Sequence, residues 1–300
     1  MTASNRAARI AKLHTSLKKH YKPVPNSNRP LMEHLLYACL LEGAPAELAD
    51  EGLAKLEQQY FDWNEVRVTT VSEIAELLSS LPNPMNAATR LKRCLQSAFE
   101  AFYSFDLEDL KKQNLGKAVE QFEALPGMTP FVLSSVAQHG LGGHSIPVDS
   151  YGLRIMFACG IINEAEMVTR KVPGLERAIP KSKGMEFGSL LQQASIALRQ
   201  DPQDKTVHAV VSAVDKDAVK SLAILELALK ASAKVATESV EDVDEEVSKS
   251  SAKKATTKKA ATKKTPAKKA AKKVQAKEAP KKEAKPAKAP AKKLTKRKPR

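Results

Sequence analysis

The sequence has few cysteines, few aromatic residues and no long apolar run. Its three cysteines, Cys39, Cys94 and Cys159, lie far apart, which excludes a disulfide framework and favours buried free thiols in a reducing compartment. The longest apolar piece, Leu222–Leu229, is much shorter than the ~18 residues of a membrane-spanning helix. The basic N-terminal stretch also lacks a signal-peptide core. We therefore expect an intracellular protein, in the cytoplasm or nucleoid (or in a eukaryotic nucleus), that does not bind a membrane.

Charge is distributed very unevenly along the 300 residues. The net charge of +15 divides into +1 over residues 1–236, −6 over residues 237–248 and +20 over residues 249–300. The last segment consists mainly of Lys, Ala and Pro, and Val274 and Leu294 are its only large apolar residues. Such a segment cannot bury a core, and we predict that it is a disordered tail.

The composition of this tail favours binding to a polyanion over a merely solubilising role. Because lysine dominates and aromatic stacking groups are absent, we expect contacts with phosphates without base reading, and a steep loss of affinity with salt. We predict that the contacts come from paired lysines: Lys253, Lys254, Lys258, Lys259, Lys263, Lys264, Lys268, Lys269, Lys272 and Lys273. Composition leaves RNA and other polyanions open beside double-stranded DNA.

Apolar residues recur at helical spacing through most of the remaining chain. The pattern predicts an all-α helical protein with four parts: a basic N-terminal segment with a surface helix (1–24), a helical domain (25–236), an acidic linker (237–248) and the tail (249–300). His208–Val214 has the composition of a strand, but we interpret it as helix in an all-helical protein.

The most informative stretch is 114–160. Residues 114–125 form an amphipathic pattern that Pro126-Gly127 ends, and Thr129 followed by Pro130 is a favoured start for a second helix. Asp149 lies near the N-cap of a third helix. A turn between two helices exposes N–H donors that suit a phosphate oxygen, although an ordinary helix corner and a simple helix cap are the alternatives.

The order Leu125-Pro126-Gly127, Val148-Asp149-Ser150 and then Arg154 resembles the helix-hairpin-helix core of the endonuclease III-like DNA glycosylase superfamily. There the pattern reads L-P-G-V-G-x-K-T-A … V-D-T-H-x-x-R. The resemblance implies that Asp149 is the catalytic aspartate, which stabilises the cationic sugar as a flipped-out base departs. It further implies a two-lobed helical bundle and contacts of the turn with double-stranded DNA. We expect a monomer without a cofactor. The turn consists of Leu125, Pro126, Gly127, Met128 and Thr129.

The departures from the family pattern narrow this expectation. Phe131 stands where lyase-competent members have lysine, and it cannot form a Schiff base. Thr129 replaces the second hairpin glycine, Tyr151 replaces the histidine, and residues 39–45 contain no glutamine that would fill the gap left by a flipped base. Residues 160–300 contain no cysteine, so the iron–sulfur cluster of many relatives is excluded.

Two functions fit these residues. One is a monofunctional DNA N-glycosylase that uses Asp149, and the other is a non-catalytic DNA-binding or nucleoid-associated protein that kept the fold. The six histidines suggest no metal site. His139 and His144 flank the glycine-rich link before Asp149, where an acid–base role competes with the commoner solvated loop histidine.

Overall fold

The computed structural model describes residues 3–25 and 27–231, which are helical throughout and contain no strand. None of their helices is long and apolar enough to cross a membrane. The acidic linker 237–248 and the tail with its lysines lie outside the described residues. The helices are α1 (Ala3–His20), α2 (Leu31–Leu41), α3 (Ala46–Gln59), α4 (Trp63–Val68), α5 (Val71–Leu77), α6 (Pro84–Phe102), η1 (Glu108–Lys112), α7 (Leu115–Glu123), α8 (Pro130–Ser135), the π-helix η2 (Val136–Gly140), α9 (Ser150–Ala158), α10 (Glu164–Val168), α11 (Leu175–Ala178), α12 (Lys181–Gln200) and α13 (Lys205–Ser212). Residues 218–231 are also helical.

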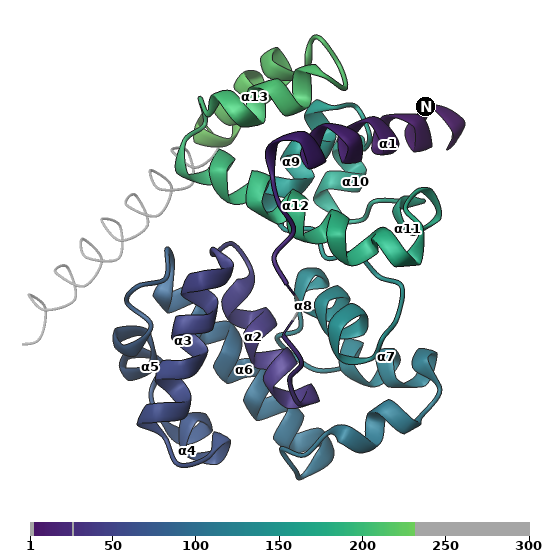
Figure 1. Ribbon diagram of the computed structural model, residues 1–300. Coiled ribbons are helices and arrows are strands. Elements are labelled where there is room, and N and C mark those ends of the chain that lie inside the picture. The colour runs from purple at the N-terminus through teal and green to yellow at the C-terminus, as the bar shows by residue number, and fades with distance from the viewer. Residues whose placement is uncertain (1–2, 26, 232–300) are drawn as a thin grey trace, which may run out of the picture. The chain divides into compact units, whose positions relative to one another are not determined.

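The first lobe comprises α2 to α8 with η1 and η2 (Figure 1). Its helices begin where the sequence supplies a start: Pro84 and Pro130 occupy first positions, and Thr70 forms a capping box with Glu73. Helix α2 is buried on nearly every side and packs against α3, α6 and α8. The single apolar core of this lobe therefore forms around α2.

The second lobe comprises α9 to α13 together with α1 from the other end of the chain (Figure 1). The sequence pattern predicts α1 correctly as a helix, and one of its faces is exposed, as expected of a surface helix. Ile10, Leu13 and Leu17 are completely buried against α11, α12 and α13. They recur every three or four residues, so one face of a basic helix enters the core. The interpretation of His208–Val214 as helix is confirmed, because α13 covers most of it.

The predicted pair of helices joined by a tight turn is confirmed over residues 115–135. Thr129 is the N-cap of α8, and its hydroxyl accepts the N–H of Val132 at 3.1 Å. Gly127 has a φ of +93°, and a Cβ added there would lie 2.6 Å from the Cβ of Arg93 on α6. The turn therefore needs glycine because it packs directly on a helix of its own lobe.

Two segments make the contacts between the lobes that concern the site. Helix α12 of the second lobe faces the loop that follows α2 in the first lobe. The Gln192 amide donates to the Leu41 carbonyl at 3.1 Å and the Ala44 carbonyl at 3.4 Å, and Arg199 donates to the Gly43 carbonyl. These bonds satisfy the carbonyls of the last residue of α2 and of the loop that follows it. They also fix the two lobes at the place where cavities open.

Candidate functional site

Asp149 is the N-cap of α9 and lies at the junction of the lobes. One of its oxygens, Oδ1, accepts the N–H of Gly152 at 2.8 Å and the hydroxyl of Ser195 from α12. The other oxygen, Oδ2, is buried and has no hydrogen-bond partner among the described residues. A helix cap needs only one acceptor, so the second oxygen adds a desolvation cost that capping does not explain.

Burial raises the pKa of Asp149, whose side chain is almost entirely enclosed. The hydrogen bonds from Ser195 and Gly152 act in the opposite direction and favour the carboxylate. Among nearby charges, Glu42 raises the pKa of Asp149 and Arg199 lowers it. Burial is therefore the main influence on the ionisation of Asp149, and the hydrogen bonds and neighbouring charges modify it; such perturbed pKa values are frequent at functional sites.

A cavity of about 290 Å³ adjoins Asp149 and is lined by both lobes. The first lobe supplies Glu42 and Arg90, and the second supplies Asp149, Arg170 and Arg199. The charges of this Asp149 cavity are therefore three guanidinium groups and two carboxylates. Such a lining suits a polar ligand with anionic groups near its rim, because guanidinium groups bind phosphate and carboxylate oxygens well.

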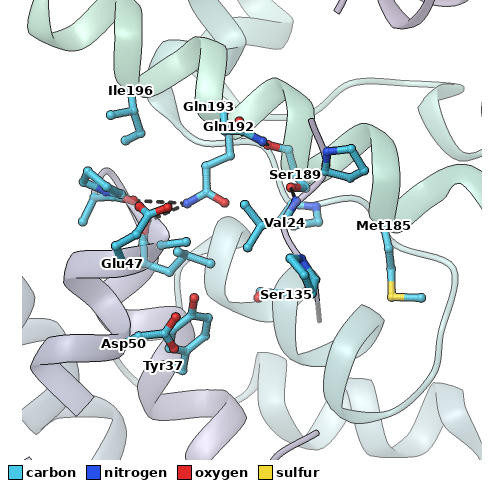
Figure 2. Close-up of a pocket in the computed structure, with 18 of the residues that line it drawn as sticks. Val24, Tyr37, Glu47, Asp50, Ser135, Met185, Ser189, Gln192, Gln193 and Ile196 are labelled. Carbon is cyan, nitrogen blue, oxygen red and sulfur yellow. Dashed lines mark hydrogen bonds between the residues drawn. The ribbon is translucent and has the colours of Figure 1, made fainter. Parts of the chain in front are cut away.

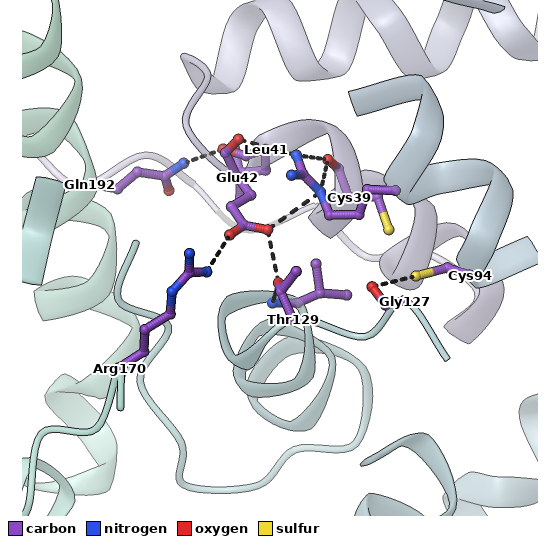
Figure 3. Close-up of polar contacts among 10 residues, drawn as sticks. Cys39, Leu41, Glu42, Cys94, Gly127, Thr129, Arg170 and Gln192 are labelled. Carbon is purple, nitrogen blue, oxygen red and sulfur yellow. Dashed lines mark hydrogen bonds and ion pairs between the residues drawn. The ribbon is translucent and has the colours of Figure 1, made fainter. Parts of the chain in front are cut away.

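Glu42 is the hub of the polar contacts around this cavity (Figure 3). Its carboxylate accepts the Thr129 hydroxyl at 2.8 Å and pairs with the Arg90 guanidinium at 3.3 Å. Across the junction, Arg170 lies 3.9 Å from its other oxygen. Arg170 has a positive φ of 54°, which is unfavourable for a residue with a side chain. Glu42 thus links α2, the hairpin turn and the second lobe.

The predicted DNA-binding turn adjoins the Asp149 cavity through Glu42. Within it, Leu125 is buried, Pro126 is exposed, and Gly127, Met128 and Thr129 are partly buried. The Cys94 thiol of α6 donates a hydrogen bond to the Gly127 carbonyl at 3.6 Å, which fixes the turn to this helix. Thr129, the residue that replaces the second hairpin glycine, already has an anionic partner, because its hydroxyl donates to the Glu42 carboxylate.

Phe131 lies in the core of the first lobe and does not line the Asp149 cavity. The Phe131 ring therefore does not fill the cavity. Because this position carries no amine, it cannot form a Schiff base with the sugar. Tyr151 does line the cavity, and the Arg154 guanidinium stacks on its ring, 4.1 Å from the ring centroid. Arg154 also pairs with Glu226 at 2.5 Å. These contacts place Arg154 in the packing of α9 against residues 218–231.

The two histidines near the glycine-rich link are not part of the Asp149 cavity. His144 Nε2 is bound by the carbonyls of Glu176 at 2.8 Å and Ile179 at 2.9 Å, so this ring joins the link to α11. His139 stacks on His34 at 6.4 Å between ring centroids. Neither histidine is a solvated loop residue, and the predicted approach to Asp149 is not seen. No three potential metal ligands come together among the residues described.

Sequence reasoning missed Glu42, Arg170, Ser195 and Arg199. A signal for the last two exists, because Gln192, Ser195 and Arg199 recur at helical spacing and form a polar stripe along the helix. Ser195 is completely buried, as expected for a polar residue that faces a specific partner. Glu42 and Arg170 carry no such signal, since their partners come from distant segments.

Comparison with known proteins gives matches of structure only: no family model and no curated protein sequence matches the chain. A thermostable thymine-DNA glycosylase is 17% identical, with a TM-score of 0.49, over 70% of this chain and 95% of its own. Endonuclease III trapped as a covalent intermediate with DNA is 14% identical, with a TM-score of 0.48, over 68% and 90%. The H. pylori 3-methyladenine DNA glycosylase bound to 1,N6-ethenoadenine is 16% identical, with a TM-score of 0.41, over 74% and 98%. These likenesses concern the fold, and neither activity nor substrate follows from them.

Proposed function

We propose that this protein binds DNA and releases a base from it by hydrolysis, with Asp149 as the catalytic carboxylate. The observation that carries the proposal is the buried, half-partnered carboxylate of Asp149 beside a cavity that both lobes line. An unpaired buried oxygen lowers stability, and such a cost is typical of functional positions. The order of the hairpin turn, Asp149 and Arg154 in the sequence supports the same function.

The reaction breaks the bond between the sugar C1′ and the base nitrogen. The bonding electrons leave with the base, which gains a proton, and water supplies the new oxygen on C1′. The Asp149 carboxylate stabilises the positive charge that develops on the sugar. Because Phe131 has no amine, no covalent link to the protein forms, and the abasic strand is left intact.

Substrate access requires the junction to change, because Asp149 Oδ2 has almost no exposed surface. Arg170 and Glu42 make the long contact across the cavity, at 3.9 Å, and Arg170 is half exposed. A DNA phosphate competes with Glu42 for Arg170 and Arg90, since both anions suit guanidinium groups. We propose that DNA opens the Asp149 cavity by replacing this contact.

A non-catalytic DNA-binding protein is the second candidate, and Glu42 is the observation that favours it. Its carboxylate holds Thr129, Arg90 and Arg170, and its negative charge lies where a phosphate would otherwise contact these groups. Glu42 also raises the pKa of Asp149, after the larger effect of burial. In this candidate the site is a closed polar contact between the lobes and performs no chemistry.

The experiment that separates the two candidates is base release from duplexes that carry a panel of damaged or mispaired bases. Hot alkali is added afterwards to cleave abasic sites, and the wild type is compared with Asp149→Asn. We expect alkali-dependent cleavage by the wild type, and a loss of more than about a hundredfold in the variant with DNA affinity unchanged. Binding without cleavage of any duplex would establish the non-catalytic candidate.

The tail is proposed to supply most of the affinity for DNA, because the rest of the chain is nearly neutral. Truncation after Ser248 removes the +20 segment. We expect an affinity loss of about a hundredfold at low salt and a shallower dependence of log affinity on log salt concentration, both measured by fluorescence anisotropy. Equal affinity and equal salt slope for the two proteins would refute this role.

A further inference from the structure

Ser195 is a completely buried polar residue on α12, and its hydroxyl donates to Asp149 Oδ1. A buried serine within a helix often bonds to a carbonyl of the preceding turn, which satisfies the hydroxyl without any distant partner. Ser195 instead reaches a carboxylate that lies 46 residues earlier in the chain. The hydroxyl therefore serves Asp149 and not α12 itself.

The helix cap formed by Asp149 does not require Ser195 either. Asp149 Oδ1 already accepts the Gly152 N–H at 2.8 Å, and one such acceptor is sufficient for an N-cap. Both donors bind this same oxygen and leave Oδ2 buried and without a hydrogen-bond partner among the described residues. Rotation of the carboxylate would break both bonds, so the two donors fix the orientation of its plane. They also leave the lone pairs of Oδ2 available to a ligand.

Helices α9 and α12 approach each other closely beside Asp149. A Cβ added to Gly152 would lie 3.1 Å from Asp149 Oδ1 and 3.5 Å from the Leu191 side chain of α12. This close packing keeps the Ser195 hydroxyl at its acceptor. Asp149 lines the Asp149 cavity, whereas Ser195 and Gly152 do not. Ser195 can therefore act on a substrate only through Asp149.

The contact between Ser195 and Asp149 lies within one lobe. Leu153 of α9 and Leu191 of α12 belong to the same apolar core, so the two helices stay together. The contact between Glu42 and Arg170 differs, because it crosses the junction between the lobes at 3.9 Å. When DNA replaces that contact, the hydrogen bond from Ser195 to Asp149 remains in place.

We propose that Ser195 is a positioning residue for base release: its hydroxyl holds the Asp149 carboxylate in its charged form, with Oδ2 facing the sugar. This inference rests on the function proposed above and adds the residue that orients its catalytic group. A hydrogen bond from a hydroxyl favours a charged carboxylate, and here it opposes burial, which raises the pKa of Asp149. Without the hydroxyl of Ser195, Asp149 takes up a proton at a higher pH.

The first measurement is made on the full-length protein without DNA. The ionisation of Asp149 is followed by NMR through its carboxyl-carbon signal, which is identified by its absence from Asp149→Asn. We expect the titration midpoint to move to higher pH in Ser195→Ala, which lacks the donor. The same shift is expected in Ser195→Cys, because a thiol fills the space but is a weak donor. Ser195→Thr keeps the hydroxyl and should titrate as the wild type does.

Ser189→Ala is the matched control for these variants. Ser189 also lies on α12, but its hydroxyl accepts the Val24 N–H at 2.9 Å beside a separate cavity (Figure 2). Asp149 does not line that cavity. The control therefore removes a bonded serine hydroxyl from the same helix, and the Asp149 titration should stay as in the wild type.

The second measurement is single-turnover base release from a duplex on which the wild type is active. We expect Ser195→Ala to release the base about tenfold more slowly at pH 7, which corresponds to one net hydrogen bond. Its acid limb should also move to higher pH, and Ser195→Thr should restore the wild-type limb. A loss of stability alone would lower the rate without moving this limb.

The two measurements separate the role of Ser195 from the proposed function. An Asp149 titration that is unchanged in both Ser195→Ala and Ser195→Cys, or an acid limb that Ser195→Ala does not move, would overturn the role of Ser195. If the wild type releases no base from any duplex, the proposed function is wrong, and the positioning role in base release is overturned with it. Because the titration needs no DNA, it shows in either case whether Ser195 holds the carboxylate.

Discussion

The two cavities at the lobe junction differ in how their acidic side chains are held. In the Asp149 cavity, Glu42 has three partners and Asp149 has two, and guanidinium groups surround both. A larger cavity of about 710 Å³ is lined by α2, the start of α3 and α12 (Figure 2), and its Glu47 is exposed and forms no ion pair among the described residues. The charged groups that line the smaller cavity are bound to one another, and some of these ion pairs and hydrogen bonds must break before a ligand enters. The larger one presents a carboxylate that forms no ion pair among the described residues.

The comparison shows that a cavity's size says little about its chemistry. The smaller cavity carries three cations and two anions, whereas the larger one is bounded by neutral imidazoles and amides and by ion pairs that are already complete. A carboxylate that already has protein partners contributes less binding free energy to a ligand than one without partners, so the partners of each carboxylate determine the ligand that a cavity favours. Variants that change single carboxylates, or that change the charge of the imidazoles, can therefore test this difference.

The largest expected effect on stability comes from His34 in the wall of the larger cavity. Burial, followed by the positive charges of neighbouring groups, lowers the pKa of His34 to about 4 from 6.5. Because the unfolded chain takes up the proton first, stability is complete above pH 6.5 and is lost as pH falls toward 4. The loss attributable to His34 is about 3 kcal/mol at pH 4.

His34→Phe removes this titration and keeps a ring beside His139. We expect urea unfolding to show a weaker fall in the free energy of unfolding between pH 7 and pH 4 in this variant than in the wild type. His20→Phe, on the exposed end of α1, should retain the full wild-type fall. If the free energy of unfolding depends on pH in the same way in the variant and the wild type, His34 does not contribute to the acid destabilisation.

Glu42→Gln tests the network of the Asp149 cavity. The amide keeps the shape but loses the ion pairs with Arg90 and Arg170, so we expect the free energy of unfolding to fall by about 1–3 kcal/mol. Chemical denaturation at neutral pH measures the change. A fall below about 0.5 kcal/mol would mean that Glu42 does not hold the junction together.

Glu47→Gln should have the smallest effect on stability. Because Glu47 has no ion pair or hydrogen bond among the described residues, we expect a change within about 0.5 kcal/mol under the same conditions. The two variants are chemically identical changes in the two cavities, so their difference measures the contrast directly. Similar losses of unfolding free energy in Glu42→Gln and Glu47→Gln would contradict the contrast between the two cavities.

Much of the fold was predictable because it rests on local signals. The helices around the hairpin turn follow from Thr129, Pro130 and Gly127, whose roles depend on residues one or two turns away. Asp149 was identified as a cap from the same kind of local signal, and the structure confirms the cap. Its catalytic role was inferred from the family resemblance alone. Ile10, Leu13 and Leu17 are recognisable as the apolar positions of α1, but their packing in the second lobe was not predicted because the helices that they contact come from the other end of the chain.

The contents of the site were less predictable, because they depend on contacts between distant segments. Glu42 meets Thr129 across 87 residues of sequence, and Arg170 reaches it from the other lobe. The larger cavity brings Tyr37 and Glu47 together with α12 in the same way. Neither arrangement has a pattern in the sequence, since a glutamate at a helix end and a tyrosine on a buried helix are both common.

The pH dependence of single-turnover base release, compared between the wild type and Glu42→Gln, tests most directly whether the charges of the Asp149 cavity control catalysis. Asp149 must be ionised to act, and burial and then Glu42 raise its pKa. We predict that release by the wild type increases with pH through an acid limb, and that this limb moves to lower pH in the variant. Identical acid limbs in the two proteins, or no release from any duplex at any pH, would contradict this account of Asp149.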